Sequence, residues 1–491
     1  MIEKYYNGVI EQVAGGIGNV EHNSILVRYS NDFSIWDLES VNHYKDQTDI
    51  FFTCHEFSYN KIAEAYEPYL GLIRQMFHKY CSGTLEEFME ECDVYKLQRP
   101  VFESYFEKGF CERTEQILID EVEYEQERMH SSIVTMLQKL SEICPIVIVL
   151  NRFQLASKST MQLTNRLLQT KNKNIGIVLG VNDVQSIPEF AHEEWDAICE
   201  SMDDRNMVYH IGNAGRNMEP DVMDYYSDYE SDDGYRKLNN LVYFLDFDQA
   251  DHHLSKIERR IKFDNFTISE KKHYQLLLLQ IMVSVLQRDI AKALESCEDL
   301  EKLQDQEKEG AFYYNFWMAT SYMYLGKLEE AMIYVQKAKE CGEALGDDFL
   351  VFRAELLKAQ NQMSGWCNIF FCAQDIEISD KLIEKLNAYH YKNHLAHIYI
   401  YAYDNKPEIV AKAYRSEAFL IYFSKGVALA KEIGNEQLIS IAYRKNIMIA
   451  STNGEYEVSL LYSIRTYEAM KDVDSVEGGR IYSGIAYNLC A

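Results

Sequence analysis

The chain has 491 residues, a length that corresponds to two to four domains of ordinary size. Its formal net charge is -28, from 77 acidic side chains against 49 lysines and arginines. A chain with this charge repels nucleic-acid phosphates and anionic lipid, so composition excludes nucleic acid and membranes as partners. A basic or apolar protein partner fits the charge better.

The counts of special residues indicate a mostly helical cytoplasmic protein. Only 6 prolines occur, and proline breaks the interior of helices. The 11 cysteines are scattered and odd in number, which is typical of free thiols in a reducing compartment. The N-terminal residues lack the apolar core of a signal peptide, and no apolar run reaches the ~20 residues of a membrane helix. We expect no cofactor and no metal.

The first part of the chain begins with helical and strand-like segments in alternation. A short helix is predicted over 3–13, followed by the glycine-rich stretch Gly15–Gly18. A dinucleotide-binding loop must follow a strand, whereas this stretch precedes one, so it is interpreted as a plain loop. Strands are predicted at 24–27 and 49–54. Apolar spacing then predicts a helix over 58–80 and broken helices over 84–141.

The clearest strand of the chain is the apolar run 145–150, which is followed by a helix at 158–170 and a second apolar strand at 175–180. Runs of β-branched residues without polar alternation are typical of strands that are covered on both faces. A strand, a helix and a strand joined by short loops form the parallel crossover unit. Residues 1–200 are therefore predicted to form an α/β domain.

Residues 201–265 are predicted to be a linker. They contain the acidic stretch 216–234, which we interpret as a solvated loop, with a docking tail for a basic partner as the alternative. A short strand is predicted at 241–245. After about residue 254 the pattern indicates only helices.

Residues 312–345 match the 34-residue tetratricopeptide repeat, a pair of antiparallel helices, without a gap. Small residues allow the two helices to cross closely, a glycine supplies the turn between them, and larger side chains fill the space inside the pair. The positions that define this match are Ala319, Tyr322, Gly326, Leu328, Ala331, Val335 and Ala338.

Weaker copies surround this repeat. Residues 274–303 carry Ala293 at the small-residue position, and 436–469 repeat the turn with Gly454 and Tyr456. Residues 349–410 follow no clear pairing. We expect four to six repeats over 266–491, since a single repeat cannot bury its apolar face. An undifferentiated helical bundle is the alternative. The last residues, 479–489, look like the first helix of a further repeat, so we expect the array to continue past residue 491 or this helix to pack elsewhere.

Three segments of the first domain carry a family resemblance. They are Ser24–Leu38 (SILVRYSNDFSIWDL), Pro145–Ser157 (PIVIVLNRFQLAS) and the strand at 175–183 (IGIVLGVND). They resemble the phosphate-loop strand, the second phosphate-site strand and the sensor strand of the AAA-type signal-transduction ATPases with numerous domains (STAND) that precede helical repeats in bacterial regulators. The resemblance implies a P-loop-like fold for this domain.

At the positions that carry the family's chemistry, this chain has other residues. Asn151 and Arg152 stand where the family has two acidic residues for Mg²⁺ and water, and neither supplies the anionic oxygen that a hard cation needs. The resemblance implies that Tyr29 and Ser34 replace loop glycines, and that the lysine and hydroxyl positions are held by Ile35 and Trp36. No arginine follows the third strand. We therefore expect a pseudo-NTPase.

Other candidate sites are weaker. Cys367 and Cys372 lack a second pair at zinc spacing, so they are interpreted as buried thiols. His390 and His394, with His397 nearby, are spaced for one helix face, but no adjacent carboxylate completes a metal site. The adjacent His252 and His253 point to different sides of a helix.

The functional hypothesis is a non-catalytic regulatory or scaffold region of a bacterial signalling protein. Its repeats are expected to bind a protein or peptide in their groove, and self-association is also considered. The resemblance further implies an output domain beyond residue 491, either a diguanylate cyclase with a GGDEF signature or a LuxR-type DNA-binding domain. The alternatives are an atypical nucleotide-binding ATPase and a purely structural adaptor.

Overall fold

The computed structural model divides the chain into two compact units. The first unit contains 1–94, 98–112 and 125–268, and the second contains 95–97, 113–124 and 269–491. Two short segments of the N-terminal half thus belong to the helical unit, which the sequence did not indicate. The residues that the structure describes are 2–18, 23–29, 34–45, 49–58, 61–170, 172–182, 187–203, 208–211, 229, 231–264, 266–364, 380–401, 417–452 and 454–470.

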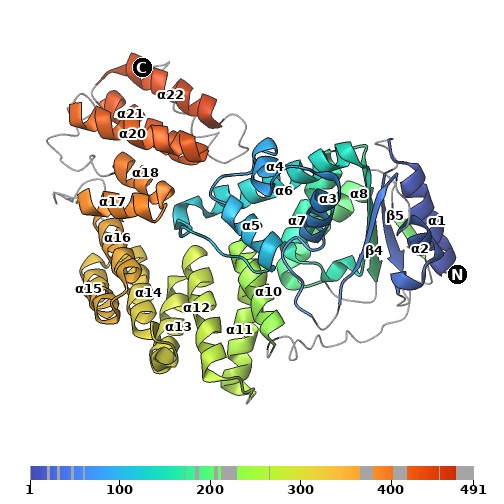
Figure 1. Cartoon of the computed structure of the whole chain (residues 1–491), viewed down its shortest axis with the longest axis horizontal. Helices are drawn as coiled ribbons and strands as arrows, with labels where there is room; N and C mark the ends of the chain where they lie inside the picture. The colour runs from blue at the N-terminus through green and yellow to red at the C-terminus, as the bar shows by residue number, and fades with distance from the viewer. Residues whose placement is uncertain are drawn as a thin grey trace. The chain divides into compact units, whose positions relative to one another are not determined.

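The first unit is built on a parallel sheet of five strands in the order β2-β3-β4-β1-β5 (Figure 1). The two central apolar runs form β3 and β4, and both are buried along their whole length, as strands covered on both faces must be. The predicted α/β fold of this part is confirmed. The strands are β1 (Ser24–Tyr29), β2 (Phe51–Glu56), β3 (Ile146–Asn151), β4 (Ile175–Asn182) and β5 (Val208–Ile211).

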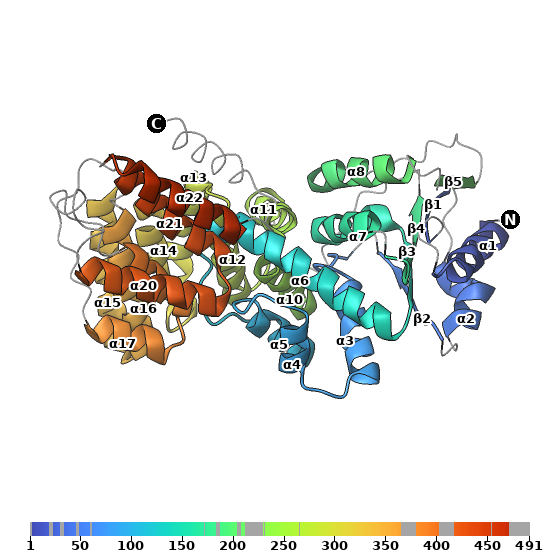
Figure 2. The same cartoon turned by 90° about the horizontal axis from the view of Figure 1, so that it is seen from above.

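Helices cover both faces of the sheet, as Figure 2 shows. On one face lie α1 (Ile2–Gly15) and α2 (Glu39–Lys45), and α1 contacts three of the strands. The helices on the other face are α3 (Tyr69–Tyr80), α7 (Lys158–Thr170), α8 (His192–Asp203) and the later part of α6 (Val122–Ile143).

The helix predicted over 58–80 begins only at Tyr69, directly after Pro68. A residue that precedes proline is disfavoured in the helical conformation, so the helix cannot extend backwards through this position. Residues 61–64 have no helical structure and 65–68 form a turn instead. The broken helices expected over 84–141 are α4 (Leu85–Glu91), α5 (Arg99–Lys108) and α6.

The predicted strand at 241–245 is wrong. Residues 241–243 are the last turn of α10 (Asp232–Tyr243), and α11 (Phe247–Phe263) follows after a turn. Helix α10 begins where the side chain of Ser231 caps the backbone N–H of Gly234. Its buried face includes Leu238 and Leu241, which lie three residues apart. A short apolar run does not by itself distinguish a strand from a buried helix, and here helical packing decides.

The second unit is a stack of helices that follow one another along an arc (Figure 1). The expected helical-repeat fold is confirmed, and pairs also form in the region where the sequence allowed no assignment. The helices are α12 (Glu270–Leu286), α13 (Ile290–Leu303), α14 (Gly310–Tyr324), α15 (Leu328–Leu345), α16 (Asp348–Ser364), α17 (Asp380–Ala388), α18 (Lys392–Tyr401), α20 (Glu417–Ile433), α21 (Glu436–Thr452) and α22 (Tyr456–Met470).

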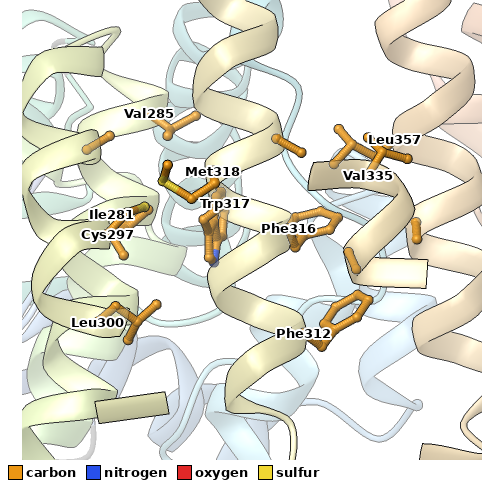
Figure 3. Packing of buried hydrophobic residues seen from close by; sticks show 14 of the residues in the cluster. Ile281, Val285, Cys297, Leu300, Phe312, Phe316, Trp317, Met318, Val335 and Leu357 are labelled. Carbon is orange, nitrogen blue, oxygen red and sulfur yellow. The ribbon is translucent and has the colours of Figure 1, made fainter. Parts of the chain in front are cut away.

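Helix α14 lies at the centre of the largest core of this unit (Figure 3). Trp317 and Met318 point toward Ile281 and Cys297 of the preceding pair, while Phe316 faces α15 on the other side. The helix pairs around α14 therefore bury apolar surface against one another, as stacked repeats do. The small residues Ala319, Ala331 and Ala338 are fully buried where helices cross.

Most turns between consecutive helices contain one residue with positive φ. Gly326, Gly434 and Gly454 have φ of 72°, 79° and 74°, a conformation that glycine adopts without strain. Arg288 and His390 take the same role with φ of 64° and 59°. His390 is thus a turn residue before α18, so the expected placement of His390 and His394 on one helix face is wrong.

Among the residues that the structure describes, no helix is long and apolar enough to cross a membrane. The predictions for 216–228, for Cys367 and Cys372, and for the helix at 479–489 lie outside the described residues.

Candidate functional site

The carboxyl ends of four parallel strands meet at one edge of the sheet in the first unit. Tyr29, Glu56, Asn151 and Asn182 are the last residues of β1, β2, β3 and β4. Ligands of open α/β sheets bind outside this edge, and three of the four residues lie in segments that carry the family resemblance. We call this place the carboxyl edge.

Asn151 is closed off by aromatic side chains. The hydroxyl of Tyr29 donates to Asn151 Oδ1 at 2.7 Å, and both side chains are fully buried. The phenol of Tyr6, from α1, lies over Gly180, where an added Cβ would collide with its hydroxyl and lie 2.6 Å from Asn151 Oδ1. Glycine at 180 therefore leaves the room that the tyrosine occupies. Burial, followed by the nearby Tyr29, raises the pKa of Tyr6 well above its usual value, so it remains a neutral phenol.

Glu56 binds the side chains that surround it. Its Oε1 lies 3.3 Å from Nη1 of Arg152, and its Oε2 accepts a 3.2 Å hydrogen bond from the hydroxyl of Ser34. Arg152 has a φ of 53°, which directs the chain sharply out of β3. Glu56 thus forms an ion pair with Arg152. Arg152 stands at a position where the resembled family has an acidic residue of its metal site.

Ile35 and Trp36 lie in a short 3-10 helix, Ile35–Asp37, which Ser34 caps. Ile35 is fully buried, whereas Trp36 is 51% exposed. An apolar core residue therefore stands at the position of the phosphate-binding lysine in the resemblance. The intervening residues 30–33 lie outside the described part of the chain. Among the described residues of the carboxyl edge, the Tyr29–Asn151 hydrogen bond and the Ser34–Glu56–Arg152 contacts thus engage protein side chains with one another.

A second titratable cluster in this unit was missed by the sequence reasoning. Glu64 pairs with Nη2 of Arg236 at 2.5 Å, and Glu67 Oε1 lies 3.4 Å from His55 Nε2. Burial, together with the adjacent Glu64, raises the pKa of Glu67 to about 7, and burial lowers the pKa of His55 to about 4. No motif marks these residues, because they come from distant turns and helices. We interpret the Glu64–Arg236 ion pair as the contact that ties α10 to the turns after β2. His55 is neutral at pH 7, so its contact with Glu67 is not an ion pair there.

The second candidate site lies in the helical unit and holds a segment of the chain itself. This segment, Arg113–Tyr124, is grouped with the repeats, whereas residues 112 and 125 belong to the first unit. We call it the resident segment. It has no regular structure before Ile119, where a single 3-10 turn leads into α6. Four carboxylates and one arginine make it strongly acidic.

Glu115 of the resident segment is held at the start of α18. Its carboxylate accepts hydrogen bonds from the backbone N–H of Asn393 at 3.1 Å and of His394 at 2.6 Å. A third contact of 2.6 Å joins it to Nδ1 of His394. The first N–H groups of a helix have no partner within the helix, and its dipole favours a negative charge there. All three side chains are buried.

Glu121 is held by three side chains of the array. It accepts from the amides of Asn393 at 2.6 Å and Asn435 at 2.7 Å, and it lies 2.8 Å from Nε2 of His397. Burial opposes the charge of this carboxylate, but His397 and the two amides outweigh burial and hold the pKa of Glu121 below its usual value. Glu121 is therefore ionised at neutral pH although it is fully buried.

Further contacts fix the rest of the resident segment. Asp120 pairs with Arg288 at 3.0 Å, and its backbone carbonyl accepts from the side chain of Gln437. The hydroxyl of Tyr124 donates to the carbonyl of Gly434 at 3.1 Å. The partners come from α18, from the start of α21 and from the turns after α12 and α20, so several repeats bind one segment.

Two of the three histidines that the sequence singled out, without assigning them a metal, have another role. His394 and His397 each contact a glutamate almost 280 residues away, which sequence spacing cannot indicate. Within the described residues, no group of three or more His, Cys, Asp or Glu could hold a metal ion. His253 is buried in α11 and contacts the hydroxyl of Tyr229.

The other repeat positions that the sequence singled out pack in the core or form turns, except Tyr456. Tyr322 stacks on Tyr334 of the paired helix at 5.6 Å, and Leu328 packs at the edge of the same core. Gly454 forms the turn before α22, and Tyr456 at the start of that helix is 38% exposed.

No protein-family model matches the sequence, and no curated protein matches it. A solved structure with a similar arrangement is the crystal structure of a Signal Transduction ATPase with Numerous Domains (STAND) protein with a tetratricopeptide repeat sensor from Pyrococcus horikoshii. It is 12% identical, with a TM-score of 0.39, and the match covers 97% of this chain and 85% of that chain.

Proposed function

We propose that this protein is a non-catalytic regulatory scaffold whose helical array binds segments of proteins. One observation carries the proposal: the array already holds an irregular segment, Arg113–Tyr124, through hydrogen bonds from α18 and the neighbouring turns. Stacked helix pairs present extended surfaces of this kind, and neighbouring repeats can together bind one partner chain.

The binding chemistry supports this role. The array supplies backbone N–H groups, amides and imidazoles rather than a nucleophile next to a base, and such groups hold a ligand without changing it. The repeats consist of rigid helices, so the donors are fixed in place before a partner arrives, which reduces the entropy cost of binding.

The first unit is proposed to be a pseudo-NTPase. Two observations support this: the hydrogen bond from Tyr29 to Asn151 at the end of β3, and the ion pair between Arg152 and Glu56. Phosphoryl transfer relies on a metal ion and on donors aimed at the phosphates. Asn151 and Arg152 supply no anionic ligand for such a metal.

Position-specific crosslinking tests the scaffold role. A photoreactive residue is placed in the native cell at Tyr324, whose hydroxyl lies by Ile119 of the resident segment, and in a second strain at Ile333, which is 57% exposed on α15. We expect one protein to be captured at 324 and not at 333. The purified partner should then bind the full chain by calorimetry, and Asn435→Ala should change its affinity, because Asn435 contacts the resident segment at this site. Capture that does not depend on position, or binding that is unaffected by the substitution, would refute the role.

An atypical nucleotide-binding ATPase is the competing function. Calorimetry of the full chain with ATP and Mg²⁺ separates the two, with no binding at micromolar ATP expected. Micromolar binding that is lost on Arg152→Ala would overturn the pseudo-NTPase proposal.

We place the scaffold in the cytoplasm of a bacterium, within a signalling protein. In this setting the array binds or senses a partner and a separate domain produces the output, of the GGDEF or LuxR type. Reading the gene past codon 491 tests that idea: an in-frame output domain supports it, and a stop codon removes it.

A further inference from the structure

We infer that the array is a receptor for acidic protein segments, and that Arg113–Tyr124 is a resident occupant of a site which an external acidic segment can take. This inference rests on the scaffold function proposed above and names the chemical class of its ligand. The net charge of -28 suggested a basic partner, whereas the groups that line this site bind carboxylates.

The first position of the site recognises a carboxylate through backbone and side chain together. The two N–H groups of Asn393 and His394 and the Nδ1 atom of His394 converge on Glu115. His394 is 2% exposed, so this contact is shielded from water and from salt. Hydrogen bonds to a charged acceptor are about twice as strong as those between neutral groups.

The second position lies six residues further along the ligand. Glu121 is surrounded by the amides of Asn393 and Asn435 and by His397. Asn435 Nδ2 also donates to Asn393 Oδ1 at 2.9 Å, so one amide orients the other. Asn393 serves both positions, through its backbone and its side chain, and this fixes the separation of the two carboxylates.

Contacts between the two positions define the rest of the ligand. Ile119 of the resident segment is buried, and Arg288 pairs with Asp120. A matching external ligand has two carboxylates six residues apart. An apolar residue lies two positions before the second carboxylate, and a further acidic residue lies immediately before it. Basic or purely apolar segments leave the donors of the array without partners, which is costly in a buried site.

The covalent tether explains why the site is full in the isolated chain. Both ends of the resident segment continue into the first unit, so its effective concentration at the array is on the order of millimolar. An external segment must compete with the resident segment at this effective concentration. Weakening the resident segment is therefore the direct way to expose the site.

The test uses the full chain and a fluorescent peptide with the sequence of residues 112–124. The receptor variant is Glu115→Ala combined with Glu121→Ala, which removes both resident carboxylates. The matched control is Glu112→Gln combined with Glu123→Gln, because both of these glutamates are exposed. A second receptor replaces residues 114–121 by glycine and serine at the same length, in case the alanine variant does not fold.

Fluorescence anisotropy should show the peptide binding to the receptor variants at least ~100-fold more tightly than to the control. A peptide with glutamine at both ligand positions should bind about tenfold more weakly for each carboxylate replaced. Equal binding of the acidic and glutamine peptides would overturn the inference and leave the scaffold function standing. Absence of binding by either peptide to a folded receptor would count against both.

Discussion

The hydroxyl of Tyr29 donates a 2.7 Å hydrogen bond to Oδ1 of Asn151, so that the last side chain of β1 closes over the last side chain of β3. Both residues are fully buried, and Tyr6 adds a second phenol at the same place. Space at the ends of these strands is therefore filled by the protein, and restoring one catalytic-type residue should not restore a site.

Asn151→Asp tests this directly. The change places a carboxylate at a fully buried position, where a charge without a partner is expensive. We expect the free energy of unfolding to fall by about 2–4 kcal/mol at pH 8, with no gain of Mg²⁺-dependent ATP hydrolysis. Urea unfolding and a phosphate-release assay measure the two effects. Asn174→Asp, half-buried just before β4, is the control and should change little. ATP hydrolysis by the Asn151→Asp variant would contradict this account, because it would show that the carboxyl edge can bind and hydrolyse ATP despite Tyr6 and Tyr29.

The stability of the first unit should depend on pH through Asp246. This carboxyl is buried and accepts from the backbone N–H of Ser159 at 2.8 Å, and burial raises its pKa to about 6 from an ordinary 3.8. Because the folded pKa lies above the unfolded value, the contribution of Asp246 to stability is fully present below pH 3.8, the unfolded pKa. This contribution is lost as the pH rises through the folded pKa of about 6.

Asp246→Asn removes this dependence, because the amide stays neutral and its oxygen can still accept from Ser159. Relative to the parent, the variant should gain ~3 kcal/mol between pH 4 and pH 7, from a shift of about two pKa units. Hydrogen exchange of the backbone amides of α7 measures the stability of the first unit separately from that of the second. Asp264→Asn, exposed at the end of α11, serves as the control. A difference between variant and parent that stays constant with pH would contradict the assignment.

The packing of the best-matched repeat predicts a large effect at Ala331. This residue is fully buried where α14 and α15 cross, so Ala331→Trp overpacks the crossing and should cost ~1–3 kcal/mol or more. Ile333→Trp, two residues away on the exposed face of the same helix, should melt like the parent. Thermal unfolding followed by far-ultraviolet circular dichroism compares the two. Equal melting of both variants would mean that the repeat register is wrong.

Glu121→Gln should loosen the resident segment. The glutamine amide would face the amides of Asn393 and Asn435, so that donors meet donors at a buried position. Removing the charge from such a site typically costs ~3–5 kcal/mol. Limited proteolysis within 113–124 should become faster, while Glu123→Gln, which is exposed, should leave it unchanged. Equal cleavage of the two variants would indicate that Glu121 contributes little to holding the segment.

The sequence predicted the parts of the fold whose pattern is local. The apolar runs of β3 and β4 and the small residues of α14 and α15 determine their structure from within short windows. Leu241–Leu245 misled because an apolar run of five residues suits a strand or a helix equally. Pro68 could have been used to shorten α3, since its steric effect on the preceding residue is readable from sequence.

The sites were predictable only in part. Departures at Asn151 and Arg152 were visible because a resemblance supplied the expected residues, whereas the role of Tyr6 depends on the close approach of α1 to Gly180. The carboxylate site joins Glu115 and Glu121 to residues 393–435, and nothing in one sequence links positions so far apart. The histidines were noticed, but their true partners were not.

Hydrogen exchange at the amides of Asn393 and His394 tests the central claim most directly, because these two groups donate to Glu115. In the parent chain both amides should be protected. In the Glu115→Ala, Glu121→Ala variant their exchange should accelerate, and the peptide with the sequence of residues 112–124 should restore protection when it is added separately. If protection is unchanged by the substitutions, or if the peptide fails to restore it in a folded variant, the array is not a receptor for acidic segments.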